Sequence, residues 1–334
     1  MVSYVRTITR RVAHTRNYAS NRHLRLIKFY TTERTEKNTC FMFPGQGTQH
    51  VGMGKDMFQN IKQARQMLQE ADSVLGFSLS RLMFEGPEAT LTKTENAQPA
   101  ILINSLAHFE TEVKTSRPEQ VQNAACVMGF SLGEYSALTA AGALSVPDAV
   151  RLVHHRGKAM QECVVGLETA MVSMFPCSVE LAEEIVVEGQ KLGACDISNH
   201  NSSTQVTISG MKDAVDAAVL YAKSRGVRRC ASLQVSCPFH SPLIKGAEDV
   251  MRELLETTQI NTPRTPVISN VTGQPMSDPN EIRRLLVDQV CGRVVFADSI
   301  LTAQKMGVTE FIEVGGGKNM SRFVEQTLKA NKIQ

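Results

Sequence analysis

Short apolar runs that end in glycine-rich turns recur along the chain. Cys40–Phe43 is one such run and is followed by Pro44–Gly47, and Ala124–Met128 is another, followed by Gly129–Gly133. An apolar run of this length bounded by turn residues is typical of a buried strand that breaks into a tight loop. Between the two runs, residues 55–75 carry apolar side chains at helical spacing, which predicts an amphipathic helix.

Further elements continue the alternation of strands and helices. A helix is predicted over residues 97–110, with Pro99 in its first turn, where a proline costs no hydrogen bond. The small-residue stretch 134–143 predicts a helix packed closely against the preceding strand, and 265–271 and 311–314 predict later strands. Because strands separated by helices form parallel sheets, we expect an α/β fold with a mostly parallel sheet.

Residues 166–235 have a different pattern. Their predicted elements follow the order β-α-β-β-α-β, which is the ferredoxin-like order, and about 70 residues is a sensible size for such a unit. We therefore expect residues 166–235 to form a small subdomain inserted into a large α/β domain made of residues 38–165 and 236–334. The strands are predicted at 171–175, near 195–198, at 205–209 and at 229–235, and the helices at 179–189 and 211–225.

The net charge of +3 is concentrated at one end of the chain. Residues 1–32 contain seven basic and no acidic side chains, so subtracting these seven charges leaves the rest of the chain at −4. An Arg-rich, acid-free segment that lacks an apolar centre matches an organelle import peptide and not a secretory signal. We predict that 1–32 is a disordered mitochondrial import presequence and that the protein is located in the mitochondrial matrix. A nucleic-acid-binding arm and a solvated tail remain alternatives for this segment.

Composition and spacing exclude several classes of protein. A mildly acidic body is a poor electrostatic match for nucleic acid, and aromatic residues make up only 5% with no Trp, so few side chains are available to stack on bases. No run of eighteen apolar residues exists, so no membrane-spanning helix is predicted. The cysteines form no CxxC pair, and the adjacent His154 and His155 cannot both face one metal from a helix, so no metal site is predicted.

Gly129–Gly133 matches the pattern G-x-S-x-G directly after a predicted strand and before a predicted helix. This is the context of a nucleophile elbow, in which flanking glycines permit a sharp turn that presents the serine hydroxyl above the next helix N-terminus. Backbone N–H groups at that terminus can stabilise a developing oxyanion. Ser131 is therefore the candidate nucleophile, with a structural βα turn and an incidental serine as the alternative.

A serine hydroxyl needs a base to become a strong nucleophile. His240 is the candidate, because it lies in the loop Cys237–Pro242 after a predicted strand, where catalytic residues of α/β folds concentrate; a structural hydrogen-bonding role is the alternative. His108 lies inside a predicted helix and is expected to be packed. For Arg156, the residue pattern alone favours a surface charge at a helix end, with a bidentate clamp for a substrate carboxylate as the alternative.

Five short motifs occur in a fixed order between Cys40 and the C-terminus. They are Phe43–Gln49, Gly129–Glu134, His155–Gln161, Pro238–Ser241 and Glu313–Gly315. Together they resemble the malonyl-CoA:acyl-carrier-protein transacylase family. The resemblance implies an acyltransferase α/β body, similar to that of α/β-hydrolases, with an inserted ferredoxin-like subdomain. Many members have His immediately before the nucleophile, whereas this chain has Phe130, in which it is similar to mitochondrial members.

The resemblance also implies a role for each site residue. Ser131 would be the nucleophile, His240 its base, and Gln289 would orient His240. Arg156 would hold the malonyl carboxylate. The oxyanion hole would be formed by the backbone N–H groups of Gln46 and Leu132.

These implied roles describe a transferase that moves a malonyl group from malonyl-CoA to the phosphopantetheine thiol of acyl carrier protein through a malonyl-serine, supplying mitochondrial fatty-acid synthesis. No metal or redox cofactor is implied, and we expect a monomer. Two alternatives are a serine thioesterase or esterase of the α/β-hydrolase type and a non-catalytic carrier-protein docking factor. The first normally places its histidine closer to the C-terminus, and the second would lack Ser131, His240 or Arg156, so both are disfavoured.

Overall fold

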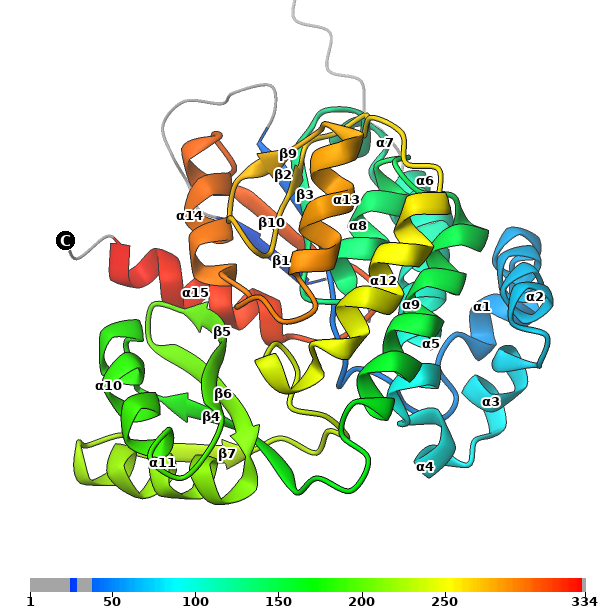
Figure 1. The fold of residues 1–334 in the computed structure, drawn as a ribbon. Coiled ribbons are helices and arrows are strands. Elements are labelled where there is room, and N and C mark those ends of the chain that lie inside the picture. The colour runs from blue at the N-terminus through cyan, green and yellow to red at the C-terminus, as the bar shows by residue number, and fades with distance from the viewer. Residues whose placement is uncertain (1–24, 29–37, 332–334) are drawn as a thin grey trace, which may run out of the picture.

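A six-stranded sheet lies at the centre of the large domain in the computed structural model, which describes residues 25–28 and 38–331 (Figure 1). Its strand order is β1-β10-β2-β3-β8-β9; the four central strands are parallel, and each edge strand is antiparallel to its neighbour. The predicted α/β fold class with a mostly parallel sheet is confirmed. The strands are β1 (Arg25–Lys28), β2 (Thr39–Phe43), β3 (Ala124–Gly129), β8 (Val267–Ile268), β9 (Pro275–Met276) and β10 (Glu310–Glu313).

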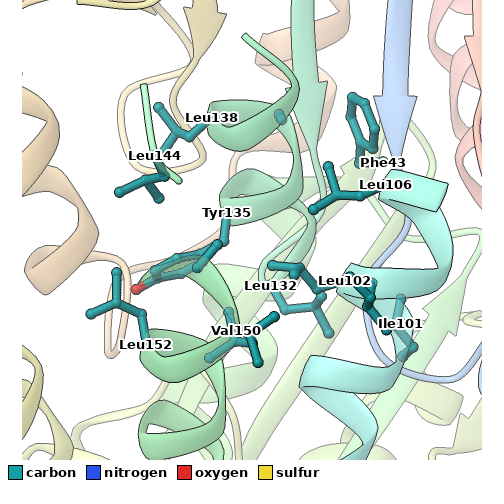
Figure 2. Packing of buried hydrophobic residues seen from close by; sticks show 14 of the residues in the cluster. Phe43, Ile101, Leu102, Leu106, Leu132, Tyr135, Leu138, Leu144, Val150 and Leu152 are labelled. Atoms are coloured by element: carbon teal, nitrogen blue, oxygen red, sulfur yellow. The ribbon is translucent and has the colours of Figure 1, made fainter. Parts of the chain in front are cut away.

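Alternate residues of β2 point to opposite faces of the sheet, and helices cover both faces. Phe41 and Phe43 pack in one core with side chains of α5, α8 and α9, which meet as Figure 2 shows. Cys40 and Met42 pack in a second core with α14 and α15. Burial on both faces explains why this strand is an unbroken apolar run. These helices are α5 (Thr94–His108), α8 (Gly133–Ala140), α9 (Val146–Glu162), α14 (Phe296–Lys305) and α15 (Asn319–Asn331).

The strand predicted over 265–271 is only two residues long, because the chain turns back immediately after Ile268. Gly273 N–H donates to the Ser269 carbonyl at 2.9 Å, and Ser269 N–H donates to the Gln274 carbonyl at 3.0 Å. The turn places Asn270 beyond the carboxyl end of β8 and beside the end of β3, where it contributes to the site described below.

The predicted helix over 55–75 is divided into two by Ile61. Ile61 has extended backbone angles (φ −121°, ψ 112°), so one helix ends before it and the next begins after it. The Arg65 guanidinium compensates for the break by donating to the carbonyl oxygens of Phe58 at 2.9 Å and Gln59 at 2.6 Å. The two helices are α1 (Lys55–Asn60) and α2 (Lys62–Leu75).

Helix α5 begins at Thr94, earlier than predicted, so Pro99 lies inside the helix and not in its first turn. A proline inside a helix leaves the carbonyl four residues before it without its usual donor. That carbonyl belongs to Glu95, and Nδ1 of His154 on α9 lies at hydrogen-bonding distance from it, 2.9 Å. A neighbouring helix thus replaces the hydrogen bond that the proline removes.

Shorter helices complete the large domain. In residues 25–28 and 38–331, no helix combines the length and apolar character needed to cross a bilayer. The remaining helical segments are α3 (Leu79–Glu85), α4 (Glu88–Leu91), the π-helical turn η1 (Phe109–Val113), α6 (Lys114–Ser116), α7 (Pro118–Gln122), the 3₁₀ turn η2 (Pro242–Ile244), α12 (Gly246–Thr257) and α13 (Pro279–Asp288).

The small subdomain has its own four-stranded antiparallel sheet, in the order β5-β6-β4-β7 (Figure 1). Its elements follow the sequence β-α-β-β-α-β, and its two helices pack against the sheet in a separate core. Backbone hydrogen bonds join its strand β5 to Val294 of the large domain, through His200 N–H at 2.8 Å and the Ser198 carbonyl at 2.9 Å. The elements are β4 (Thr169–Phe175), α10 (Val179–Gly189), β5 (Cys195–Ser202), β6 (Gln205–Met211), α11 (Lys212–Ser224) and β7 (Arg229–Ser232).

Strand β1 corrects one expectation about the leader. Residues 25–28 fall within the stretch 1–32 that the sequence predicts to be disordered, yet they pair with β10 along its outer edge. Without a neighbour, β10 would expose a row of unpaired backbone N–H and C=O groups along its outer edge. Residues 25–28 pair with these groups, which is the physical reason for the strand. The rest of the predicted presequence lies outside the described residues.

The turn from β3 into α8 brings backbone against backbone. A Cβ at Gly129 would lie 1.9 Å from the carbonyl carbon of Gly133, and a Cβ at Gly133 would lie 2.2 Å from the carbonyl oxygen of Phe43. Neither position has room for a side chain, and the obstructing atoms are backbone and cannot move aside. The first turn of α8 therefore rests directly on the ends of β2 and β3.

We predict that Gly133→Ala destabilises the fold by more than about 3 kcal/mol, because overpacking against backbone exceeds the usual range for a buried methyl group. Urea denaturation followed by circular dichroism measures the loss. Gly246→Ala is the matched control, since its Cβ would meet only the Cys163 sulfur at 3.2 Å. Equal midpoints for the two variants would contradict the close approach described for α8.

Candidate active site

Ser131 lies at the tip of the turn between β3 and α8, in a left-handed backbone conformation with φ 54°. A non-glycine residue rarely adopts this conformation, and it persists only where its surroundings hold it. Asn270 does so from the turn after β8: its Oδ1 accepts a hydrogen bond from Ser131 N–H at 2.6 Å, and its Nδ2 donates to the Gly129 carbonyl at 2.7 Å. The predicted sharp turn from strand to helix, called the elbow below, is present with Ser131 at its tip, and the Asn270 side chain holds it in place.

His240 lies in the loop between β7 and η2, 3% exposed and also left-handed at φ 57°. Its Nε2 lies 2.8 Å from Ser131 Oγ, and its Nδ1 lies 2.9 Å from the main-chain carbonyl oxygen of Gln289. Because a carbonyl only accepts, the network assigns the proton to Nδ1 and leaves Nε2 free to accept the serine proton. The candidate nucleophile and base are therefore in direct contact.

Burial, reinforced by the positive charge of Arg156, lowers the pKa of His240 to about 3. The imidazole is therefore neutral throughout the ordinary working range of pH. A neutral imidazole is the form that removes a proton from a hydroxyl, and the unfavourable imidazolium readily gives that proton up again.

Arg156 is 1% exposed and lies in the interior of α9, which continues to Glu162. The expectation of a surface charge at a helix end, drawn from the residue pattern alone, is wrong. Its neighbour Gly157 explains the burial, because a Cβ there would lie 2.5 Å from the Thr94 carbonyl oxygen, so α9 packs closely against the start of α5. The guanidinium also lies over the Tyr135 ring, with Cζ 5.7 Å from the ring centroid.

The partners of the Arg156 guanidinium are all neutral. Its Nη1 donates to Gln98 Oε1 at 2.9 Å, and its Nη2 donates to Gln289 Oε1 at 2.9 Å and to Ser131 Oγ at 3.1 Å. No salt bridge joins it to a carboxylate of the described residues. Desolvation lowers the pKa of Arg156 below its usual value, but an arginine stays protonated in proteins. A buried positive charge thus lies beside the candidate nucleophile without a direct ion pair, although the nearby Glu134 carboxyl group interacts with it electrostatically.

Gln289, which follows α13, contacts three other groups of the site besides His240. Its Oε1 accepts from Arg156, and its Nε2 donates to the Ser131 carbonyl at 2.9 Å and to Oε2 of Glu134. Its contact with His240 uses the main chain and not the side chain. The structure therefore brings together Ser131, His240, Arg156 and Gln289, all of which the sequence singled out.

Of the two backbone N–H groups expected to form an oxyanion hole, one belongs to the elbow and the other to a loop that packs against it. Leu132 follows Ser131, and Gln46 belongs to the loop after β2, whose Gly45 approaches the elbow so closely that a Cβ would lie 2.6 Å from the Phe130 carbonyl oxygen. Within the described residues, neither N–H donates a hydrogen bond. The side chain of Gln46 is held by Thr94, whose Oγ1 accepts from its Nε2 at 3.3 Å.

Phe130 packs away from the hydrogen-bonded groups. Its ring lies 5.3 Å from that of Phe296 and 6.1 Å from that of Phe323, measured between centroids. The phenylalanine at this position therefore adds an aromatic contact with α14 and α15. Across the described ranges, no group of three His, Cys, Asp or Glu side chains is arranged to hold a metal ion.

Three contributors were missed by the reasoning from single residues: Gln98, Glu134 and Asn270. Each bonds to a site residue that is distant in the sequence, by 58 residues for Gln98 with Arg156 and by 155 for Glu134 with Gln289. Glu134 alone had a local signal, since an acidic residue directly after the G-x-S-x-G turn falls on the first turn of a buried helix.

Comparison with known proteins identifies the class. A family model described as the acyl transferase domain matches residues 40–334, so the chain is an acyltransferase. The malonyl CoA-acyl carrier protein transacylase of Bacillus subtilis (strain 168) is 39% identical over 288 residues, which cover 86% of this chain and 89% of that protein. The chain belongs to the malonyl CoA-acyl carrier protein transacylase family.

Solved structures of similar proteins have the same fold. The acyl-carrier-protein-S-malonyltransferase from Bartonella henselae is 38% identical with a TM-score of 0.81, over 86% of this chain and 92% of that one. A malonyl-transacylase solved in complex with its type II PKS acyl-carrier protein is 32% identical with a TM-score of 0.82, over 88% and 94% of the two chains. Membership of a transferase family sets aside the hydrolase alternative, and the presence of Ser131, His240 and Arg156 disfavours a non-catalytic docking factor.

Proposed function

We propose that the chain transfers a malonyl group from malonyl-CoA to the phosphopantetheine thiol of acyl carrier protein, and that it does so in the mitochondrial matrix, supplying fatty-acid synthesis there. The names of its relatives support the donor, and the solved complex of a relative with its acyl-carrier protein supports the acceptor. The basic, acid-free leader supports the location.

The observation that carries the proposal is the buried guanidinium of Arg156 beside Ser131 Oγ, bonded only to neutral groups. A malonyl thioester differs from an acetyl thioester by one carboxylate, and burying that charge without a partner would be costly. A guanidinium receives both carboxylate oxygens in a charge-assisted pair. The site therefore offers the one group that an acyl chain ending in a carboxylate needs.

In the first half of the proposed cycle, Ser131 Oγ attacks the thioester carbonyl while its proton passes to His240 Nε2. The carbonyl oxygen becomes an oxyanion and is stabilised by the N–H groups of Gln46 and Leu132. As the tetrahedral intermediate collapses, the carbon–sulfur bond breaks and His240 returns the proton to the CoA sulfur. Malonyl-Ser131 and free CoA result.

The second half reverses these steps with another thiol. The phosphopantetheine thiol gives its proton to His240 Nε2 and attacks the ester carbonyl, and the same two N–H groups stabilise the oxyanion. The Ser131 oxygen leaves and recovers the proton from His240. Every proton and acyl movement has a named group on this chain, so the proposed cycle uses no metal or redox cofactor.

Ser131→Ala should abolish covalent malonylation, because the acyl acceptor is lost. Intact-mass measurement after incubation with malonyl-CoA, followed by peptide mapping, detects the added malonyl group on the wild-type chain. Ser136→Ala is the matched control: its hydroxyl lies on α8, the helix that follows the elbow, is buried, and has no hydrogen-bond partner among the described residues. Undiminished labelling of Ser131→Ala would assign the nucleophile elsewhere.

Arg156→Ala should depress malonyl transfer by two or more orders of magnitude and leave acetyl transfer unchanged or faster, since removing one member of a buried charge pair costs roughly 2–5 kcal/mol. Arg156→Lys should recover only part of the loss, because an ammonium lacks the planar fork. The measured quantity is the malonyl-to-acetyl ratio of kcat/KM for the three proteins. An unchanged ratio in Arg156→Ala would remove the carboxylate-binding role.

Deletion of residues 1–24 should prevent uptake by isolated mitochondria and leave the activity of the purified chain unchanged, because it removes five of the seven basic charges of residues 1–32 and keeps strand β1. Deletion of residues 1–32 should in addition lower the melting temperature, since it exposes the edge of β10. Equal uptake of the full-length and shortened chains would argue against the presequence.

A further inference from the structure

Glu134 is an acidic side chain buried at the centre of the site, 1% exposed, with no part in the proposed proton transfers. It lies on the first turn of α8, one helical turn after Ser131. Its two carboxyl oxygens accept from two different segments: Oε1 from the main-chain N–H of Asn270 at 3.2 Å, and Oε2 from Nε2 of Gln289. The side chain thus joins the turn that fastens the elbow to the residue that supports both His240 and Arg156.

The direction of these hydrogen bonds decides how the Gln289 amide is oriented. Its Nε2 has two hydrogens, and Glu134 and the Ser131 carbonyl accept them. Its Oε1 is thereby turned toward Arg156, whose Nη2 donates to it at 2.9 Å. With the opposite amide orientation, Nε2 would face the guanidinium N–H groups, so that two donors would meet. The Glu134 carboxylate and the Ser131 carbonyl would then lose the donor that Nε2 supplies.

We propose that Glu134 is a positioning residue, whose carboxylate fixes the Gln289 amide and so sets the direction in which Arg156 presents its guanidinium to the substrate. The role rests on the proposed function in so far as Arg156 receives a substrate carboxylate. Glu134 touches neither substrate nor the reacting atoms in this arrangement. It acts through Gln289, from the side of the amide that faces away from Arg156.

The arrangement requires an acceptor at both oxygens of residue 134. An amide at this position would turn its own NH₂ group either toward Asn270 N–H, where two donors would meet, or toward Gln289. In the second case Gln289 would have to reverse to offer its oxygen, which turns its NH₂ group to Arg156. A protonated carboxyl group weakens the same arrangement, because its hydroxyl group carries a donor where the ionised form only accepts.

Protonation of Glu134 falls within an accessible range of pH. Burial raises its pKa to about 7, against the opposing effects of the Gln289 and Asn270 hydrogen bonds and the charge of Arg156. The titratable groups around it are Arg156 from α9, Tyr135 beside it on α8 and His240 from the loop before η2. Arg156 stays protonated, burial raises the pKa of Tyr135 to about 12, and that of His240 is about 3, so none of these three titrates near neutral pH.

The sign of the pH effect follows directly. The ionised fraction of Glu134 grows as pH rises through about 7, so the arranged form of the site is present above this pH and lost below it. The value of kcat/KM for malonyl transfer should therefore fall about tenfold for each pH unit below 7. Because His240 is already neutral in this pH range, its titration cannot produce this fall of kcat/KM, which forms the acidic limb of the pH profile.

The test compares pH profiles of kcat/KM from pH 5.5 to 8.5 for the full-length wild type, Glu134→Gln and Glu310→Gln. Glu310 is the matched control, because it is a buried glutamate that accepts a hydrogen bond from Thr39 Oγ1 at 3.3 Å. Both residues begin their strands, so they lie at the end of the sheet opposite the site. Titration of the substrate is common to all three proteins and cancels in the comparison.

We expect the wild type and Glu310→Gln to show the acidic limb, and Glu134→Gln to show a flat profile, at pH 8 at least tenfold below wild type. The malonyl-to-acetyl ratio of kcat/KM should also fall in Glu134→Gln, because Arg156 loses its fixed direction. A merely structural role would lower the melting temperature and the rate at every pH but would keep the limb. A limb at the same pH in Glu134→Gln, or unchanged kinetics, would overturn the proposal.

Two further measurements keep the outcome decisive. If Glu134→Gln does not fold, the proposal is tested with the pH profiles of the wild type and of Glu134→Asp, a variant that keeps the charge. A wild-type value of kcat/KM that stays level down to pH 5.5 contradicts the proposal. The wild type is also tested for malonylation by intact mass before any variant. Absence of malonylation there refutes the proposed function, whereas malonylation with a pH-independent rate refutes only the role of Glu134.

Discussion

The burial of one positive charge imposes the strongest constraint on this structure. Arg156 has lost almost all contact with water, and the free-energy cost of that burial must be offset by groups of the protein. Three acceptors on three separate segments do so: Gln98 on α5, Ser131 at the elbow and Gln289 after α13. Since each acceptor is fixed by the packing of its own element, the guanidinium ties the positions of α5, α8, α9 and α13 to one another.

A second constraint acts on the backbone. Both Ser131 and His240 hold left-handed conformations that cost about 1–3 kcal/mol for residues with a side chain. The cost is met locally, by the Asn270 side chain at the elbow and by the Gln289 carbonyl at the imidazole. These unusual conformations turn Oγ and Nε2 toward each other from segments 109 residues apart in the sequence. Backbone strain and the contact between the candidate nucleophile and its candidate base therefore coincide in the same two residues.

The fold could be predicted from the sequence wherever the signal is local. Apolar runs ending in glycine located β2 and β3, and the element order of 166–235 located the small subdomain. The local sequence pattern gave a wrong prediction where a contact outside the pattern decides how the helix forms. Ile61 interrupts a periodic helix because Arg65 can compensate for the break, and Pro99 is tolerated inside α5 because His154 on another helix replaces the missing donor.

The site residues also differ in whether a local sequence pattern could predict their role. Ser131 has a local pattern and His240 a recognisable loop, but the pattern around Arg156 indicates a surface charge, since the burial of residue 156 depends on how closely Gly157 lets α9 approach α5. The resemblance to a family assigned Arg156 and Gln289, but it left open which atoms of Gln289 act. Only the three-dimensional arrangement separates its main-chain contact with His240 from its side-chain contact with Arg156.

Recognition and reactivity are linked through a single hydrogen bond of this arrangement. Arg156 Nη2 donates to Ser131 Oγ, and this hydrogen bond draws electron density from the oxygen that attacks in the proposed cycle. In the proposed cycle, a substrate carboxylate is a stronger acceptor than a neutral hydroxyl and competes for the same guanidinium. In that cycle a malonyl group would weaken the hydrogen bond to Ser131 Oγ, whereas an acetyl group, which has no carboxylate, would leave it in place. Under the proposed function, Arg156 would therefore both recognise the carboxylate of the substrate and control the hydrogen bonding of Ser131 Oγ.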